Sequence, residues 1–211
     1  MLPYYHTVKG YGENEIVIEK SRFIAHVTRA ETEEEAQEFI QLIKKQHWNA
    51  THNCSAYLIG ENDQIQKAND DGEPSGTAGV PILEVLKKRH VKDTVVVVTR
   101  YFGGIKLGAG GLIRAYGKAT SEGLNATGIV ERKLMTIMHT KVDYTWLGKL
   151  ENELRSSIYK VKEIHYLENV EIEVFVEKGQ TEAFTNWMIE LTNGQCEVRE
   201  GQKLYLEEDV I

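Results

Sequence analysis

Carboxylates, cations, hydroxyls and glycines that could bind or transform a ligand lie in two glycine-rich polar segments. The first runs from Asp70 to Gly79, and the second runs from Arg100 to Gly111. Eleven of the chain's eighteen glycines lie between residues 72 and 128. Glycine is favoured where the backbone needs a positive φ or where a partner approaches the main chain closely. This concentration therefore indicates a ligand site.

The second segment has the setting of an anion site. It follows a valine-rich strand and leads into a helix, so it exposes unpaired N–H groups at the positive end of the helix dipole. Residues 84–128 carry eight basic and three acidic side chains, which makes the surroundings basic. The predicted anion or nucleic-acid contacts are Arg100, Gly103, Gly104, Lys106, Gly108, Gly110, Gly111, Arg114 and Lys118. The alternative is that the glycines only permit tight packing and that the helix cations form a solvated face.

The spacing of this segment matches neither phosphate-binding fingerprint. The P-loop pattern Gly-x-x-x-x-Gly-Lys-Ser/Thr is absent. The dinucleotide-binding pattern Gly-x-Gly-x-x-Gly is also not matched, because residue 113, where its last glycine would stand, is Ile. No nucleotide cofactor is therefore predicted.

The first segment could act in more than one way. Asp70, Asp71 and Glu73 could hold Mg²⁺, which prefers carboxylate oxygens. Ser75 and Thr77 could be nucleophiles only beside a base, and the sequence places none next to them. The commoner use of such residues is a structured turn with carboxylates capping backbone N–H groups. An ion pair with the basic loop is a further alternative, and it would make both segments structural. No metal ligand or catalytic residue is predicted, and these five side chains are candidates for lining the site.

His52 is a sixth candidate for lining the site, although we expect it to be a structural histidine at the start of a strand. With His47 and Cys54 it has no known metal-ligand spacing. To act as a general base it would need a hydrogen-bond partner, and the acidic first segment supplies the nearest candidates by motif.

Hydrophobic periodicity predicts the elements that position these residues. Residues 15–29 alternate around a turn at 19–21, which indicates two antiparallel strands. Thr32 and Glu35 form a capping box ahead of an amphipathic helix that ends near His47. The pattern then predicts strands at 54–59 and 65–68, a helix with Pro81 in its first turn, a fully buried strand at 94–99 and a helix at 110–127.

A second domain is predicted after Gly128. Its pattern gives a strand at 131–144, a helix with an apolar stripe from Leu147 to Ile158, strands at 161–167 and 170–176, a helix near 184–191 and a strand at 196–206. This βαββαβ order indicates a ferredoxin-like domain, so the fold class is α+β with domains 1–128 and 129–211. Glu171, Glu173 and Glu177 are interpreted as a solvated face of the alternating strand.

Composition narrows the functional classes. The net charge is −7, and residues 129–211 hold 16 acidic against 10 basic side chains, which makes the chain a poor nonspecific nucleic-acid binder. A local basic face can still bind a nucleic acid. The absence of a signal-peptide pattern and of a membrane-length apolar run predicts a cytoplasmic protein with no membrane partner. Cys54 and Cys196 are expected to be small buried hydrophobes without a disulfide.

Three motifs together carry a family resemblance. They are Ala50-Thr51-His52-Asn53-Cys54-Ser55-Ala56-Tyr57, the segment 70–79, and Arg100-Tyr101-Phe102-Gly103-Gly104 with Leu107-Gly108. They resemble the Impact family in its bacterial YigZ/YvyE-like branch. The resemblance implies a first domain similar to the second domain of ribosomal protein S-five and a second domain similar to a ferredoxin-like elongation-factor-G domain. Eukaryotic relatives are translation regulators, but their kinase-regulating role uses an additional domain and does not transfer.

The sequence therefore favours a non-enzymatic, translation-linked protein that binds RNA or a ribosomal surface through the basic glycine-rich loop. One alternative is an enzyme acting on a phosphorylated metabolite or nucleotide, with the first segment placing Mg²⁺ or a proton. Another is a protein-interaction module that binds a protein partner through the acidic C-terminal sheet.

Overall fold

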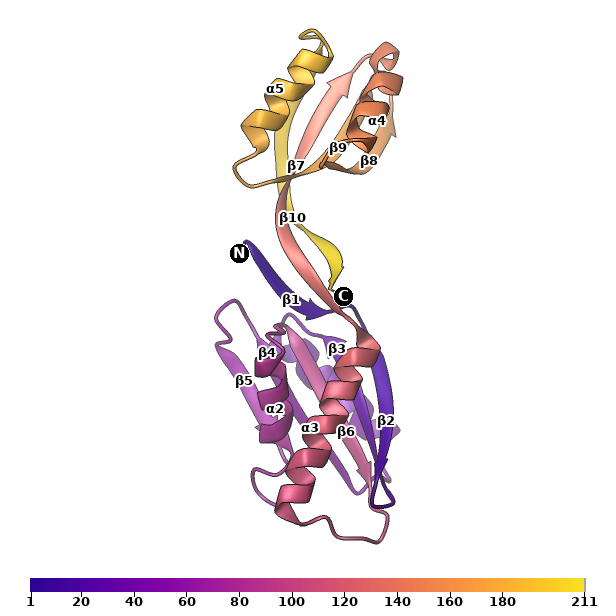
Figure 1. Cartoon of the computed structure of the whole chain (residues 1–211), viewed down its shortest axis with the longest axis vertical. Helices are drawn as coiled ribbons and strands as arrows, with labels where there is room; N and C mark the ends of the chain where they lie inside the picture. The colour runs from indigo at the N-terminus through magenta and orange to yellow at the C-terminus, as the bar shows by residue number, and fades with distance from the viewer. Residues whose placement is uncertain (211) are drawn as a thin grey trace. The chain divides into compact units, whose positions relative to one another are not determined.

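The computed structural model describes residues 1–210, which divide into two compact units (Figure 1). The N-terminal unit comprises residues 2–132 together with the end of the chain from Glu208, and the C-terminal unit comprises Met1 and residues 133–207. The chain thus has the mixed α+β architecture with two sheets that the sequence predicts. The domain boundary expected after Gly128 lies four residues before the end of the N-terminal unit's main segment at Arg132.

The N-terminal unit is built on a five-stranded sheet in the order β2-β3-β6-β4-β5. Every neighbouring pair in it is antiparallel. The strands are β2 (Gly12–Ile18), β3 (Ser21–Arg29), β4 (His52–Ile59), β5 (Ile65–Asn69) and β6 (Thr94–Tyr101). The predicted hairpin is confirmed, and Glu19 and Lys20 form its turn with positive φ. A separate strand, β1 (Tyr4–Val8), neighbours β7 in the second sheet.

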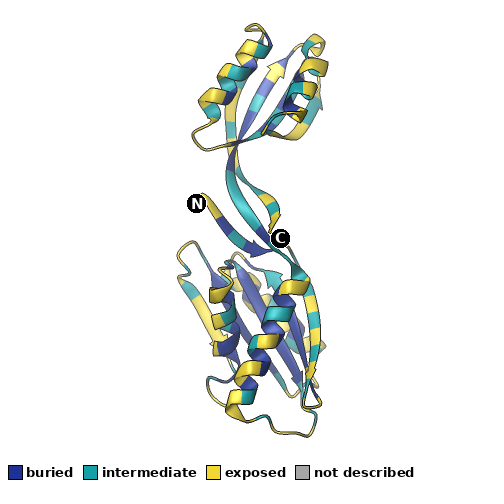
Figure 2. Ribbon diagram, in the orientation of Figure 1, coloured by how far each residue is buried: buried dark blue, intermediate teal, exposed yellow. Residues whose placement is uncertain are grey.

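Helices cover both faces of this sheet. Side chains of α2 (Gly79–Lys88) and α3 (Gly108–Thr127) pack on one face, where Val96 and Val98 of β6 point. α1 (Glu33–Gln46) packs on the other face, against Val95 and Val97. The central strand β6 is therefore buried on both sides, which explains its unbroken run of valines (Figure 2).

Local sequence signals set the helix ends. Thr32 Oγ1 accepts the N–H of Glu35 at 3.2 Å, as the capping box predicts. The reciprocal bond differs slightly, because Glu35 Oε2 accepts the N–H of Glu31 at 2.7 Å rather than that of Thr32. The last turn of α1 carries Lys44 and Lys45, which suit the negative end of the helix dipole.

The C-terminal unit has the predicted order βαββαβ. Its elements are most of β7 (Ile129–Val142), α4 (Leu147–Arg155), β8 (Lys160–Tyr166), β9 (Val170–Glu177), α5 (Thr181–Leu191) and most of β10 (Cys196–Val210), with a short 3-10 turn η1 (Tyr144–Trp146) before α4. Strands run in the order β8-β9-β7, and β10 also pairs with β7. Both helices pack on the face formed by Val170, Ile172, Val174 and Val176.

Three sequence interpretations of single residues are wrong. Ile158 does not belong to the apolar stripe of α4, because the helix ends at Arg155 and Ile158 is 79 % exposed. Glu171 and Glu173 are largely sheltered, because their side chains are only 23 % and 13 % exposed and form ion pairs, whereas Glu177 is exposed as predicted. Cys196 is only partly buried, whereas Cys54 is fully buried. In the residues described, no helix has the length and apolar character required to cross a membrane.

Candidate functional site

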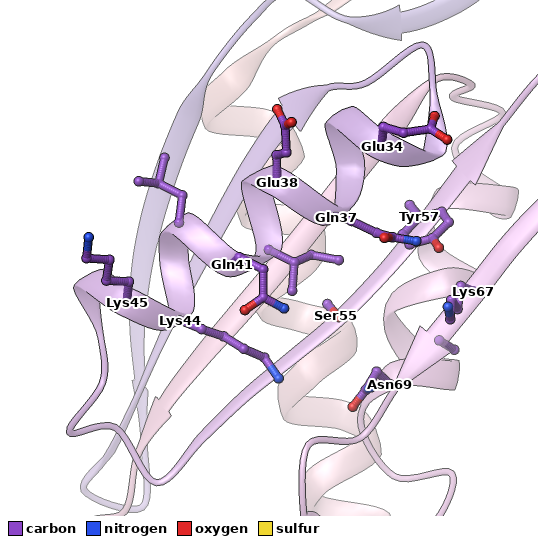
Figure 3. A pocket seen from close by; sticks show the side chains of 13 residues that line it. Glu34, Gln37, Glu38, Gln41, Lys44, Lys45, Ser55, Tyr57, Lys67 and Asn69 are labelled. Atoms are coloured by element: carbon purple, nitrogen blue, oxygen red, sulfur yellow. The ribbon is translucent and has the colours of Figure 1, made fainter.

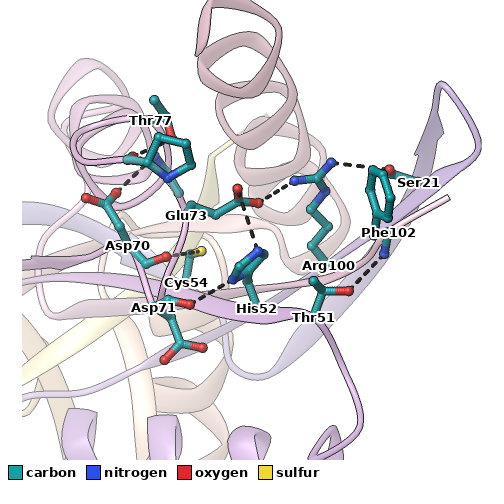
Figure 4. A network of polar contacts seen from close by, with 12 residues as sticks. Ser21, Thr51, His52, Cys54, Asp70, Asp71, Glu73, Thr77, Arg100 and Phe102 are labelled. Carbon is teal, nitrogen blue, oxygen red and sulfur yellow. Dashed lines mark hydrogen bonds and ion pairs between the residues drawn. The ribbon is translucent and has the colours of Figure 1, made fainter. Parts of the chain in front are cut away.

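The two glycine-rich segments meet in space at one end of the N-terminal sheet. Antiparallel pairing of β4 with β6 sets His52 opposite Arg100. The Arg100 guanidinium donates from Nη1 to Glu73 Oε1 at 2.6 Å, which joins the second segment to the first (Figure 4). The ion pair that the sequence left open as an alternative is therefore present.

The pair between Glu73 and Arg100 is enclosed. Their side chains are 3 % and 6 % exposed. Glu73 Oε1 also accepts the Tyr116 hydroxyl at 2.7 Å, and Glu73 Oε2 lies 3.8 Å from His52 Nε2. Glu73 thus receives contacts from β4, β6 and α3 at once, and it acts as the centre of a buried polar network.

The Arg100 side chain makes its contacts within the protein interior. Its guanidinium carbon lies 5.4 Å from the Phe23 ring centroid and 5.5 Å from that of Phe102. Nη2 lies 3.4 Å from Ser21 Oγ, and Nε is buried without a hydrogen-bond partner among the described residues. The charge of Arg100 is compensated by Glu73, so its role in this arrangement is to hold the two segments together.

Asp70 caps the start of α2. Its Oδ1 accepts the N–H groups of Ala78 at 3.0 Å and Gly79 at 2.8 Å, and its Oδ2 accepts that of Gly76 at 2.8 Å. Partial burial raises the pKa of this carboxyl, but the three backbone donors lower it by more, and the pKa lies below its usual value. The carboxylate therefore fills the anion position that the α2 N-terminus offers.

Asp71 joins the network to α1. Its Oδ1 pairs with Lys44 Nζ at 2.6 Å, and its Oδ2 accepts the N–H of Asn53 at 2.7 Å. Its carbonyl oxygen lies 2.8 Å from His52 Nδ1, so His52 contacts both Asp71 and Glu73. The backbone of Asp71 has a φ of +44°, a conformation that aspartate tolerates better than most residues.

The hydroxyls of the first segment are not arranged as nucleophiles. Thr77 is buried and donates from Oγ1 to the carbonyl oxygen of Pro74 at 2.6 Å, which closes a turn. Ser75 is exposed on the loop. The structured-turn interpretation of residues 70–79 accounts for these contacts.

Cys54 and Tyr116 lie beneath the network. Cys54 Sγ is 3.0 Å from the carbonyl oxygen of Asp70 and 3.3 Å from Tyr116 Oη. Burial raises the pKa of the Cys54 thiol to about 12, and it also raises that of the Tyr116 hydroxyl well above its usual range. Both groups therefore stay protonated at neutral pH and serve as hydrogen-bonding groups of the interior.

The loop between β6 and α3 is anchored at its first two residues. The N–H of Phe102 donates to Thr51 Oγ1 at 3.0 Å, and the N–H of Gly103 donates to Ser21 Oγ at 3.1 Å. A Cβ on Gly103 would lie 2.0 Å from the backbone carbonyl of Lys20, so only glycine fits there. The hairpin turn between β2 and β3 therefore fixes where the loop begins.

The start of α3 differs from the start of α2. The residue before its first turn, Leu107, gives no side-chain cap, and the first turn holds no acidic residue. Gly104 and Gly108 have φ of +88° and +66°, and open space surrounds the position where each Cβ would be. The backbone at this helix start is accessible and has no carboxylate of its own.

Three predicted cations lie in the loop before α3 and along this helix, and Lys118 is the farthest from its start. Lys106, Arg114 and Lys118 are exposed, and none has an ion-pair partner within residues 1–210. A Cβ on Gly110 would lie 3.6 Å from Arg114 Nη1, so the guanidinium folds back over the first turn. A Cβ on Gly111 would contact only the side chain of Leu107. The basic second segment thus separates into Arg100, which is buried, and three exposed cations.

Sequence reasoning missed several partners in the network. Thr51 and Asn53 lie in the first family motif, and that motif is the sequence signal from which their place in the network could have been predicted. Ser21, Lys44 and Tyr116 lie in other elements and carry no local sequence signal. Their contacts follow from the strand order and from the packing of α1 and α3.

A separate pocket of about 780 Å³ lies between α1, β4 and β5. In Figure 3, Gln37, Gln41 and Lys44 point from α1 toward the strands, whereas Lys45 points away. Both acidic and basic side chains line it, and Lys44 is already paired with Asp71. The polar network, rather than this pocket, is where the predicted site residues converge.

Comparison with known proteins adds two domain matches. Residues 19–124 match the Impact N-terminal domain, and residues 140–195 match a domain of unknown function, DUF1949. The first match contains both glycine-rich segments and the whole polar network.

Related proteins match this chain over different shares of its length. The IMPACT family member YvyE of Bacillus subtilis is 74 % identical over all of this chain and 97 % of its own length. The IMPACT family member YigZ of Escherichia coli is 31 % identical over 86 % of this chain and 90 % of its own length. A Protein IMPACT homolog of Dictyostelium discoideum is 40 % identical over 46 % of this chain but only 29 % of its own length. A crystal structure of a hypothetical protein superposes with a TM-score of 0.61 and 28 % identity, covering 94 % of this chain and 97 % of that one.

Proposed function

The chain belongs to the Impact family, and from this premise we propose that it is a non-enzymatic, translation-linked protein that binds RNA at the start of α3. The link to translation rests on the family resemblance. The choice of RNA rests on the chemistry of the β6–α3 loop and of the helix that follows it.

The observation that carries the proposal is the contrast between two helix starts. Asp70 fills the anion position of α2 with its own carboxylate. The start of α3 has no such cap and instead has exposed Lys106 and Arg114 nearby. A helix N-terminus with added cations favours phosphate through both its N–H groups and its dipole.

An exposed aromatic residue favours RNA over a free phosphate. Phe102 is 46 % exposed, and Arg100 lies against its ring. Proteins that bind single-stranded RNA combine aromatic platforms, on which bases stack, with basic side chains that contact phosphates. Phe102 stands at the beginning of the same loop that carries Lys106, so both contacts could be made by one strand.

The contacts disfavour the enzymatic alternative. A Mg²⁺ ion needs carboxylate oxygens that can face it. Asp70 accepts three backbone N–H groups, Asp71 pairs with Lys44, and Glu73 pairs with Arg100. These carboxylates are used to build the loop connections, which supports a binding role for the segment that they position.

Binding of single-stranded RNA over a series of salt concentrations tests the proposal. We expect wild-type affinity to fall as salt rises, and the variant Lys106→Ser with Arg114→Ser to bind more weakly with a slope shallower by about two, one for each lost phosphate contact. The matched control is Lys45→Ser with Arg155→Ser, which changes net charge equally at exposed sites on α1 and α4.

Three outcomes are decisive. Loss of binding in the loop variant but not in the control supports the site. Equal loss in both would show that only net charge matters, and no RNA binding by the wild type would end the proposal. Co-sedimentation with ribosomes, compared for the same two variants, tests the link to translation separately.

A further inference from the structure

The face of the C-terminal sheet opposite α4 and α5 carries a cluster of histidine and carboxylate side chains. His139 of β7 lies in register opposite Glu173 of β9, and Glu171 is two residues before it on the same face. His165 of β8 pairs in register with Glu171. Three neighbouring strands therefore place metal-ligating side chains together, away from the apolar core.

The donor atoms of one trio are close enough to share an ion. His139 Nδ1 lies 2.7 Å from Glu171 Oε1 and 3.7 Å from Glu173 Oε1. The ligand atoms of these three residues all lie within 4.8 Å of one another. Ligands bound at about 2 Å in a tetrahedral site are separated by similar distances. The side chains are 14 %, 23 % and 13 % exposed, so the trio is sheltered but reachable.

Two further features surround the trio. Gly201 of β10 leaves room for the imidazole, because a Cβ there would lie 2.4 Å from His139 Nε2. A pocket of about 170 Å³ adjoins the trio and is lined by His139, Lys141, Glu171, Glu197 and Arg199. The pocket has room for an ion with water ligands, and Glu197 adds a carboxylate to its wall.

Arg199 occupies the position of a cation in this arrangement. Its Nη2 lies 2.8 Å from Glu171 Oε1 and 3.3 Å from His139 Nδ1. Lys162 similarly pairs with Glu173 Oε2. The side chain of Arg199 is 55 % exposed, so it can move away at little cost, because ion pairs at the surface contribute little to stability.

We infer that His139, Glu171 and Glu173 form a binding site for one divalent ion of the zinc class, with Arg199 as the cation that the metal displaces. Imidazole together with carboxylate suits Zn²⁺, whereas Mg²⁺ and Ca²⁺ prefer oxygen ligands alone. One nitrogen and two oxygens would leave a fourth position for water. The site is independent of the RNA-binding loop.

Zinc titration of the chelator-treated full-length protein tests this inference. Competition with a chromophoric zinc indicator gives affinity and stoichiometry, and thermal melting with and without zinc gives a second readout. We expect one equivalent to bind to the wild type. His139→Gln and Glu171→Gln should each lose at least tenfold in affinity. Glu182→Gln, which removes an exposed carboxylate from the first turn of α5, is the matched control for Glu171→Gln and should retain that equivalent.

A variant of Arg199 separates a metal site from a structural ion-pair network. Arg199→Met removes the competing cation, so it should bind zinc as tightly as the wild type or more tightly. Weaker binding in this variant would contradict the displacement. Absence of a stoichiometric equivalent in the wild type, or unchanged affinity in both His139→Gln and Glu171→Gln, would overturn the site. Thermal melting without zinc shows whether each variant is folded. If either His139→Gln or Glu171→Gln is unfolded, the other still tests the site.

Discussion

Glu73 and Arg100, 27 residues apart in the chain, form a buried ion pair that holds the loop before α2 against the end of β6. Glu73 is the counter-ion of the Arg100 guanidinium, and its Oε1 accepts hydrogen bonds from both Arg100 and Tyr116. Loss of this pair would separate the two glycine-rich segments.

Substitution of Glu73 should destabilise the protein strongly. Glu73→Gln leaves the Arg100 charge buried without a counter-ion, and removal of one partner of a buried pair costs about 3–5 kcal/mol. The measurement is the free energy of unfolding of the N-terminal domain in urea. Lys87→Ala, which removes the exposed pair with Glu84, is the control and should cost about 0–1 kcal/mol. Equal effects for the two substitutions would contradict a central role for Glu73.

Two glycine substitutions should have opposite effects. Gly103→Ala places a methyl group 2.0 Å from the Lys20 carbonyl, so the loop must shift, and we expect lower stability and weaker RNA binding. Gly117→Ala lies in the interior of α3, where the nearest atom is Val85 Cγ2 at 3.9 Å. It should stabilise by up to about 1 kcal/mol, because alanine is the better helix former. Thermal melting of the two variants gives the sign of each effect.

Asp70 should contribute stability that depends on pH. Because its pKa in the folded protein lies below the ordinary value of 3.8, its contribution is complete above that value and is lost as the pH falls through the folded pKa. Asp70→Asn should cost about 1–2 kcal/mol at neutral pH and should flatten the acid limb of the stability curve. Urea unfolding from neutral pH to pH near 3 measures both effects, and parallel curves for the variant and the wild type would exclude this role.

Cys54 should resist alkylation until the protein unfolds. In the folded state burial raises the pKa of its thiol to about 12, so it remains protonated at pH 9.0, where an ordinary thiol is half ionised. In the Cys196→Ser variant, labelling by iodoacetamide should therefore be slow without urea and fast with it. Rapid labelling of the folded variant would show that the interior around Cys54 opens.

Much of the fold follows from local patterns in the sequence. Alternation from Val170 to Val176 predicts β9 and its buried face, and the Thr32 capping box predicts the start of α1. Ile158 continues the spacing of Leu150 and Leu154 by chance, because the helix has already ended. Periodicity identifies a face but does not locate the end of a helix.

The site could be predicted only in part. The sequence marks Glu73 and Arg100 as candidates, but their pairing depends on β6 lying between β3 and β4, which no local pattern specifies. Glu171 and Glu173 were expected to face solvent because they alternate with valines. The structure shelters them because histidines and cations of neighbouring strands lie on the same face.

The hydroxyls of Thr51 and Ser21 divide the β6–α3 loop into a part whose amide protons are already hydrogen-bonded and a part whose amide protons can reach a ligand. They already use the amide protons of Phe102 and Gly103. In the part of the chain that the structure describes, the loop amides open to a ligand therefore begin at Gly104. Phosphate contacts to backbone amides would accordingly start at that residue and extend into the first turn of α3, whereas Phe102 and Gly103 could meet RNA only through other atoms, such as the Phe102 ring.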